Sequence, residues 1–443
     1  MRITKKQLKS LDEYKYSGID KSIVSRHVLG PWWTWLVGRM PMNLAPNMIT
    51  FLGLCFVIVN VATLLVLDPT YSGRNLPSLV YLSWSFGLFA YQSMDAIDGK
   101  QARRTGMAGP LGEMFDHGID AINTTLEVIL CSHALGLTRS WWTVASQCAT
   151  LANFYLSTLA RSSSLRRYQL TFSSRWEEYN TGTLYLSAFS GPVEGILLIC
   201  GIYLITAFHP SGSAFWATPV AQLFPGDFAV EIARKADEAF NLKGSWSLES
   251  LPVNVGFMAF AGLGTIGNIV NAYWNVILSR RKANKPILPP LLGLLPFITH
   301  TTILLAWLHA ELRGGVSLVN DARLLPFMGY WGMSFSYQVS QLILAHVTKS
   351  PFPYWNGMML FSLFGAIDAN SMWLFGREPL VQNTPYTANV FVWMSFLLAL
   401  FNYIRFAREV IWQITEHTGI ACFTVRHKDS NGQWVEDGVK KAE

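Results

Sequence analysis

The sequence predicts an all-α integral membrane protein with about ten transmembrane helices and an N-terminal amphipathic helix that lies in the membrane interface. Of the 443 residues, 51% are hydrophobic and only 14% are charged, whereas a soluble globular protein carries roughly 25% charged residues. Apolar runs of about 20 residues, the length that a helix needs to cross a bilayer, recur along the chain. These observations exclude a soluble enzyme, a disordered protein and a domain anchored by one helix.

Residues 1–47 are expected to form a cytoplasmic N-terminal segment. The early lysines are not followed by an apolar core and a small-residue cleavage site, so we expect no signal peptide. Residues 25–40 combine tryptophan with arginine, at Trp32, Trp33, Trp35, Arg26 and Arg39. Indole rings prefer the headgroup layer, which favours a helix lying in the interface. A buried helix of the soluble type is the alternative.

Ten candidate spans make up a polytopic domain at 48–412, whose catalytic part is expected at 48–207. The spans are 48–67, 78–98, 112–137, 142–160, 184–207, 253–278, 289–309, 324–347, 356–375 and 388–412. With an even number of spans, both ends of the chain lie on one side of the membrane. The polar tail at 413–443 is expected on that side, in the cytoplasm, and is expected to be loosely ordered.

Loop charges alternate in phase with these ten spans. The formal net charge is +6 at pH 7, and in a membrane protein an excess of Lys and Arg marks cytoplasmic loops rather than a nucleic-acid partner. The basic loops on the expected cytoplasmic side carry Lys100, Arg103, Arg104, Arg161, Arg166, Arg167, Arg175, Arg280, Arg281, Lys282 and Lys285. Because the opposite loops are acidic or mixed, both termini are predicted to be cytoplasmic.

Six titratable residues gather where the second and third spans meet: Asp95, Asp98, Glu113, Asp116, His117 and Asp120. Charged residues inside a membrane span are costly and mark functional sites. Residues three or four apart share a helix face, so one pair of aspartates ends the second span and the other pair begins the third. Four converging carboxylates would repel one another strongly unless cations lay between them.

The ligand chemistry favours a hard divalent cation. Carboxylate oxygens without cysteine or paired histidine suit Mg²⁺ or Mn²⁺ better than zinc, and two such ions can clamp a diphosphate during an in-line displacement. Small residues at Gly99, Ala102 and Gly112 leave a slot in which a nucleotide can approach. Arg103 lies one turn past Gly99, placed to hold phosphate oxygens. Helix capping explains Glu113 alone, but not both acidic pairs.

The same segment resembles the signature of the CDP-alcohol phosphotransferase family, D-x2-D-G-x2-A-R-x8-G-x3-D-x3-D. Every fixed position is filled, by Asp95, Asp98, Gly99, Ala102, Arg103, Gly112, Asp116 and Asp120. The local sequences DGKQARRT and PLGEMFDHGID, with LAPNMIT at residues 44–50, are similar to the eukaryotic choline/ethanolamine phosphotransferase branch. The resemblance covers most of the chain, although only the signature is specific.

This resemblance implies a phosphoalcohol transfer from CDP-choline or CDP-ethanolamine to the hydroxyl of diacylglycerol, with release of CMP. It implies that two Mg²⁺ ions are held by Asp95, Asp98, Asp116 and Asp120. It also implies that the nucleotide and its phosphates are contacted by Asn47, Gly99, Ala102, Arg103 and Gly112. The eukaryotic branch implies an endoplasmic reticulum or Golgi membrane, with the site facing the cytoplasm.

His117 is the expected general base. The alcohol of diacylglycerol needs a base or a metal ion to become a nucleophile, and His117 remains in the site if all four aspartates bind cations. Glu113 lies one turn earlier and can accept the second imidazole proton, which fixes the tautomer. In more distant relatives the last aspartate of the signature is the usual base, which is Asp120 here. A purely structural His117 is a further alternative.

Two groups of residues carry no settled role. The segment 175–179, which contains Glu177 and Glu178, can close over a trimethylammonium group by cation–π attraction or can belong to an interfacial belt. Glu194 and Asp368 lie within spans, where a carboxylate facing lipid is costly.

Glycines in the sixth span, Gly262, Gly264 and Gly267, predict close helix packing, either within the chain or across a homodimer. The alternative functions are an ion-coupled transporter and a family member that uses another alcohol acceptor. Transporter folds show internal symmetry and broken helices, and no repeat is visible here. A noncatalytic lipid-binding protein does not explain a complete acidic set. The sequence does not distinguish choline from ethanolamine.

Overall fold

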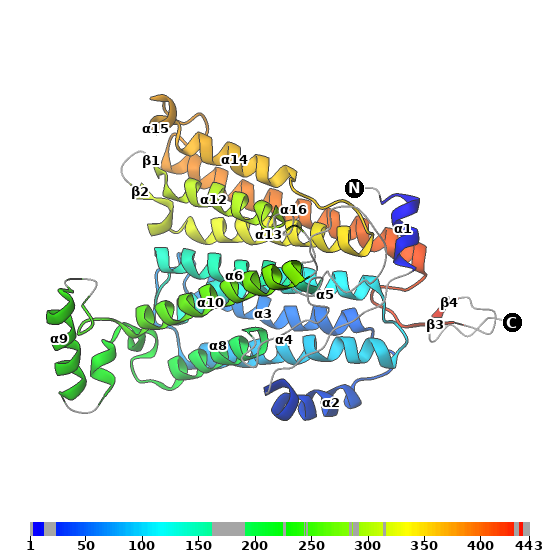
Figure 1. The fold of residues 1–443 in the computed structure, drawn as a ribbon, viewed down its shortest axis with the longest axis horizontal. Coiled ribbons are helices and arrows are strands. Elements are labelled where there is room, and N and C mark those ends of the chain that lie inside the picture. The colour runs from blue at the N-terminus through cyan, green and yellow to red at the C-terminus, as the bar shows by residue number, and fades with distance from the viewer. Residues whose placement is uncertain are drawn as a thin grey trace.

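The computed structural model describes residues 3–12, 24–161, 191–224, 227–242, 244, 247–282, 286, 292–312, 316–428 and 434–436. This part of the chain is almost entirely helical, and Figure 1 shows long helices lying side by side along the longest axis of the molecule. Apart from an isolated bridge between Pro219 and Pro252, strand pairing in the described ranges consists of two short antiparallel pairs, β1 with β2 and β3 with β4. The predicted helical class is confirmed.

The N-terminal half supplies the helices α1 (Lys5–Leu11), the π-helical turn η1 (Ser25–Leu29), α2 (Gly30–Arg39), α3 (Pro46–Leu67), α4 (Ser78–Arg104), α5 (Pro110–Ala134), α6 (Trp141–Arg161) and α8 (Gly191–Phe208). Both α3 and α5 begin with proline, which fits the first helical position because its missing N–H has no partner there in any case.

The C-terminal half follows with η2 (Gly212–Ala217), η3 (Val220–Leu223), α9 (Phe228–Phe240), α10 (Val253–Lys282), α12 (Leu295–His309), β1 (Glu311–Leu312), β2 (Val316–Ser317), η5 (Leu318–Asn320), α13 (Leu324–Val347), α14 (Gly357–Ala369), α15 (Ser371–Phe375), α16 (Pro385–Thr418), β3 (Arg426–Lys428) and β4 (Trp434–Glu436). In the two hairpins Glu311 pairs with Ser317, and Arg426 pairs with Glu436.

Each of the ten predicted spans overlaps a helix of the described residues. Three helical segments are long and apolar enough to cross a membrane: Pro46–Leu67, Val253–Val270 and Pro385–Thr418. Their outward side chains are apolar, as Val66 (78% exposed) and Phe260 (74% exposed) illustrate. These features are those of a membrane protein, whereas the number of crossings stays a prediction.

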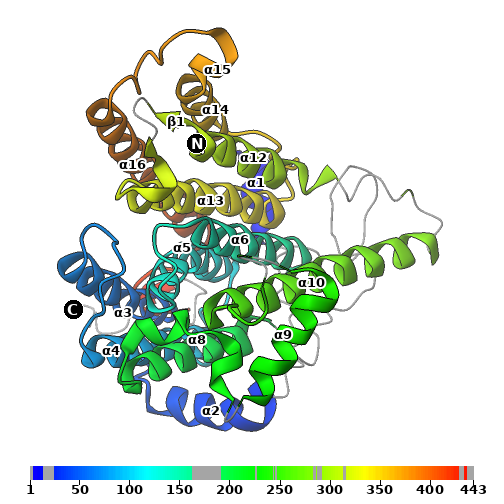
Figure 2. The same ribbon diagram turned by 90° about the vertical axis from the view of Figure 1, so that its left-hand side faces the viewer.

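Helix α13 joins the two halves of the bundle. Figure 2 shows it between α5 and α6 on one side and α12, α14 and α16 on the other. Small residues allow the close approach: a Cβ added at Gly332 would lie 2.6 Å from Oγ1 of Thr125 in α5. The core therefore runs through the centre of the bundle, and α5 lies within it.

The predicted interfacial helix is present as η1 followed by α2, which packs against α4. Trp33 is buried, while Trp32 and Trp35 are exposed and stack with ring centroids 5.1 Å apart. Trp32 Nε1 also donates to Ser93 Oγ of α4 at 3.1 Å. The helix is thus tied to the bundle on one face, and its position in the headgroup layer stays a prediction.

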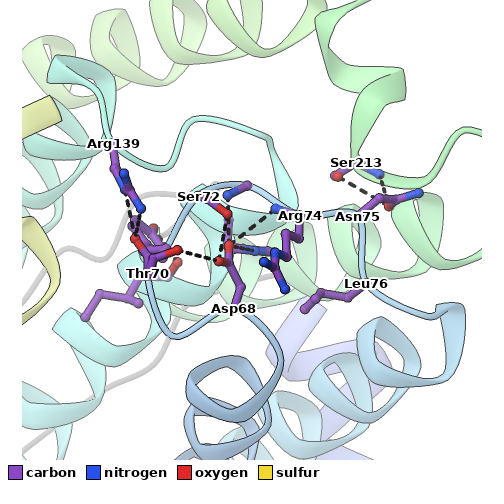
Figure 3. A network of polar contacts seen from close by, with 12 residues as sticks. Asp68, Thr70, Ser72, Arg74, Asn75, Leu76, Arg139 and Ser213 are labelled. Atoms are coloured by element: carbon purple, nitrogen blue, oxygen red, sulfur yellow. Dashed lines mark hydrogen bonds and ion pairs between the residues drawn. The ribbon is translucent and has the colours of Figure 1, made fainter. Parts of the chain in front are cut away.

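The turn between α3 and α4 lies at the end of the bundle opposite to α1 (Figure 1). Figure 3 shows its polar contacts gathered around Asp68. The buried carboxylate accepts from Ser72 Oγ and from Gly73 N, both at 2.8 Å, and lies 3.3 Å from His133 Nε2 of α5. Burial alone raises the pKa of Asp68, but the hydrogen bonds of Ser72, Gly73 and Arg74 outweigh it and hold that pKa well below its usual value.

The structure gives Asp368 a structural role. Its buried carboxylate accepts backbone N–H groups from Leu380, Val381 and Gln382, and so fixes the loop that precedes α16. This explains a carboxylate inside an apolar helix without any contact to lipid.

The predicted close packing at the α10 glycines has no partner among the described residues. A Cβ added at Gly262, Gly264 or Gly267 would meet nothing within 4 Å. Packing within the described chain therefore does not explain them, and the homodimer alternative stays a prediction. The segment 175–179, with Glu177 and Glu178, lies outside the described residues, as do Arg166, Arg167 and Lys285.

Candidate metal centre

A sharp turn brings the end of α4 next to the start of α5. Helix α4 continues past its predicted end to Arg104, so the predicted phosphate-binding residues are helical. Gly106 follows with φ 69°, a left-handed conformation that glycine adopts without strain. Met107 N then donates to Ala102 O at 2.9 Å, the bond that closes a Schellman motif. The signature's spacing is thus realised as two antiparallel helix ends.

Three carboxylates from the two helices meet at this turn. Single oxygens of Asp95, Asp98 and Asp116 all lie within 4.8 Å of one another. Two oxygens on opposite sides of a Mg²⁺ ion, each bonded at 2.0–2.1 Å, are about 4.2 Å apart. The spacing and the all-oxygen chemistry therefore fit a hard divalent cation, as the sequence predicts.

Hydroxyl groups from neighbouring positions hold two of the aspartates. Thr50 of α3 donates through Oγ1 to Asp98 Oδ2 at 2.5 Å, and Tyr91 of α4 donates to Asp120 Oδ1 at 2.5 Å. Asp120 lies outside the group of three mutually close carboxylates. The structure therefore brings three of the four predicted metal ligands together, with the fourth hydrogen-bonded beside them.

His117 is buried in α5, with 4% of its surface exposed. Its Nδ1 lies 3.4 Å from Asp116 Oδ2. Glu113, the predicted partner of the imidazole, lies half-buried in the first turn of the same helix. An aspartate of the acidic group thus contacts the ring, and the pairing with Glu113 stays a prediction.

Comparison with known proteins agrees with this site. Residues 43–222 match the family model of CDP-alcohol phosphatidyltransferases. An uncharacterised class-I protein of that family from Schizosaccharomyces pombe is 38% identical to the chain over 97% of it and 98% of the relative. The chain belongs to the CDP-alcohol phosphatidyltransferase family.

Named relatives of this family member are choline/ethanolamine phosphotransferases, the branch that the local sequences DGKQARRT and PLGEMFDHGID resemble. Cholinephosphotransferase 1 of Saccharomyces cerevisiae is 33% identical, with 96% of the chain and 98% of the relative aligned. Choline/ethanolaminephosphotransferase 1 of Arabidopsis thaliana is 30% identical, over 95% of the chain and 97% of the relative. The similarity therefore extends through the C-terminal helices, which lie beyond the matched family model.

In this CDP-alcohol phosphatidyltransferase family member, the predicted nucleotide-contacting residues of α4 and α5 lie between the acidic group and the turn that joins the two helices. A Cβ added at Gly99 would lie 3.7 Å from Arg103 Nη1, so the exposed guanidinium lies beside the glycine. A Cβ added at Gly112 would lie 3.9 Å from Asn47 Oδ1. Gly112 of α5 therefore lies beside Asn47 of α3, whereas the contact of Gly99 is within α4, where Ala102 is half-buried.

The segment after α16 also reaches the site, contrary to the expectation of a loosely ordered tail. Helix α16 continues to Thr418, and Cys422 then accepts from Asn47 Nδ2 at 3.6 Å. The ring of Phe423 contacts Phe115 of α5 at a centroid distance of 5.5 Å. Hydrophobic contacts across more than 300 residues explain the order, and no local sequence pattern indicates them.

Thr50 and Tyr91 are the site residues that the sequence analysis missed. A weak signal was available for both: Thr50 is the last residue of the LAPNMIT segment, and Tyr91 lies one helical turn before Asp95. Their hydrogen bonds to the aspartates depend on how α3, α4 and α5 pack, which a motif does not encode.

Proposed function

We propose that the chain transfers phosphocholine, phosphoethanolamine or both from the CDP-alcohol to the hydroxyl of 1,2-diacylglycerol, giving phosphatidylcholine or phosphatidylethanolamine and CMP. The observation that carries this proposal is the group formed by Asp95, Asp98 and Asp116 within 4.8 Å, on the two helices that bear the complete family signature. The names of the yeast and Arabidopsis relatives support the choline and ethanolamine donors.

The four aspartates are proposed to hold two Mg²⁺ ions, with Mn²⁺ as a substitute. Bound there, the cations would neutralise the diphosphate and stabilise charge on the attacking and leaving oxygens. Thr50 orients Asp98 and Tyr91 orients Asp120 through their hydroxyl groups. Such second partners of a metal ligand fix its position before the cation arrives.

Arg103 and the small residues around it are proposed to bind the donor. An exposed guanidinium beside Gly99 can hold phosphate oxygens by paired charge-assisted hydrogen bonds. The absence of side chains at Gly99 and Gly112, with only a methyl group at Ala102, lets the nucleotide approach the backbone. Asn47, fixed by Cys422, offers its amide oxygen at the edge of this slot.

His117 is proposed to remove the proton from the acceptor hydroxyl. When Nδ1–H faces Asp116 Oδ2, Nε2 is the ring atom that accepts the proton. Asp120 is the alternative base, but one of its oxygens already accepts the Tyr91 hydroxyl. The site is proposed to face the cytoplasm of an endoplasmic reticulum or Golgi membrane, so that CDP-alcohol arrives from water and diacylglycerol from the bilayer.

A competition assay tests the proposed function. The purified full-length protein receives CDP-choline and CDP-ethanolamine, each with its own label, together with diacylglycerol and Mg²⁺. We expect CMP release in step with formation of labelled phospholipid, and loss of both on chelation of the metal. A folded protein that forms no CMP and no phospholipid under these conditions would refute the proposal. The ion-coupled transporter would then be the favoured hypothesis.

A further inference from the structure

Two buried carboxamides lie one helical turn inside the acidic group, on the side away from the nucleotide slot. On α4, Gln92 precedes Asp95 by three residues; on α5, Asn123 follows Asp120 by three. The two are at matching depth, because Gln92 lies 12 residues from the end of α4 and Asn123 lies 13 residues from the start of α5. At 1.5 Å per residue both depths are roughly 18–20 Å.

Both side chains are buried, and three of their polar atoms have no hydrogen-bond partner among the described residues. Gln92 is 2% exposed and Asn123 is 6% exposed. Among the described residues, neither the amide nitrogen nor the oxygen of Gln92 has a partner, and the same is true of Asn123 Oδ1. A buried polar atom without a partner costs free energy comparable to a lost hydrogen bond, so such atoms in a folded protein call for a partner, either a ligand or ordered water.

The two residues face the same site. Positions 92, 95 and 99 share one face of α4, and positions 116, 120, 123 and 127 share one face of α5. The hydrogen bond from Tyr91 to Asp120 holds these faces together at this level. Along α4 and α5, the proposed donor-binding residues lie nearer the turn between the two helices than the carboxylates do, and the carboxamides lie farther from it.

We propose that Gln92 and Asn123 form the binding site for the polar part of the lipid acceptor, a glycerolipid with one free hydroxyl and ester-linked chains. Gln92 Nε2 donates to an ester carbonyl. Asn123 Oδ1 accepts from the free hydroxyl as the lipid binds, and the hydroxyl then turns its one proton to His117 Nε2 for removal, so that its oxygen faces the acidic group. This inference rests on the proposed function and names its acceptor site.

The ester contact is tested with two acceptors that differ only in their carbonyl groups, 1,2-diacylglycerol and its 1,2-dialkyl ether. The variant Gln92→Met keeps the side-chain volume and removes both amide groups. We expect the wild-type protein to prefer the diacyl acceptor in kcat/KM, and Gln92→Met to lose about tenfold with that acceptor alone, the worth of one hydrogen bond of about 1.4 kcal/mol. In Gln92→Met, the ratio of kcat/KM for the diacyl acceptor to that for the dialkyl ether should then approach one. The KM for CDP-alcohol should stay unchanged.

The hydroxyl contact predicts a different pattern. Asn123→Leu should raise KM for both acceptors alike, because both carry the hydroxyl. Gln147→Met is the matched control, because Gln147 of α6 is a buried carboxamide whose Nε2 donates to Thr125 Oγ1 at 2.8 Å. This variant should leave the acceptor preference unchanged.

Gln92→Met with an unchanged preference, or Asn123→Leu with an unchanged acceptor KM, would overturn the corresponding contact. A wild-type protein that is inactive with both acceptors would instead refute the proposed function, so the two failures are distinguishable. An unchanged KM for CDP-alcohol in each variant shows that the protein is folded.

Discussion

Replacing Thr50 with valine tests how the acidic group is held, because this change removes one hydroxyl and keeps the side-chain shape. Thr50 is 1% exposed and its Oγ1 donates to Asp98 Oδ2 at 2.5 Å. Loss of a partner that orients a metal ligand typically lowers metal affinity about 10–100-fold. A hydrogen bond to a charged group contributes about 1.5–3 kcal/mol, which is the same range. We therefore expect the Mg²⁺ concentration for half-maximal CMP release to rise by that factor.

The assay is a Mg²⁺ titration of CMP release at saturating CDP-alcohol and diacylglycerol. Thr50→Ser restores the hydroxyl and should restore the Mg²⁺ requirement. Thr158→Val is the matched control, because Thr158 is a buried threonine of α6 that donates to Phe154 O at 2.9 Å. An unchanged Mg²⁺ requirement in Thr50→Val, with normal unfolding temperature, would refute the role of Thr50 in holding the metal ligand.

Three further changes have defined outcomes. His117→Ala should lower kcat about 10²–10⁴-fold, the usual contribution of a general base, while calorimetry still detects CMP binding; wild-type turnover would disprove the base. Phe423→Ala should raise KM for CDP-alcohol several-fold, because each aromatic contact is worth about 0.5–1.5 kcal/mol and the segment after α16 fixes Asn47. A KM equal to that of wild type would mean that this segment is not needed for donor binding. Because the pKa of Asp68 is lower in the folded protein than in the unfolded chain, its stabilisation is complete above pH about 4 and is lost as pH falls further. The unfolding temperature should thus drop between about pH 4 and 2 more steeply for wild type than for Asp68→Asn, and parallel curves would count against this linkage.

Helical periodicity explains why so much of the acidic site was predictable. Asp95 and Asp98 are three residues apart, so one pattern places both carboxylates on one helix face, and both belong to the group of three. The apolar runs likewise gave the approximate positions of the helices, because a membrane span needs a fixed length. The end of α4 was less predictable: the charged residues after Asp98 ended the predicted span, whereas the helix continues to Arg104.

Contacts between distant segments account for what the sequence did not reveal. The local sequence shows Asp368 only as an acid in an apolar helix. The fold shows that its carboxylate accepts hydrogen bonds from the backbone N–H groups of Leu380 and Val381. The contact between Asn47 and Cys422 joins the two ends of the chain. Such pairings depend on helix packing and leave no periodic signal in either segment.

Binding of Mn²⁺ to the purified protein, followed by electron paramagnetic resonance, tests the central claim that α4 and α5 share a divalent cation. Asp95→Asn removes a carboxylate from α4, and Asp116→Asn removes one from α5. The account predicts that either substitution alone weakens binding by at least tenfold while the protein stays folded. Mn²⁺ binding of wild-type strength in either variant would contradict a metal site built from both helices.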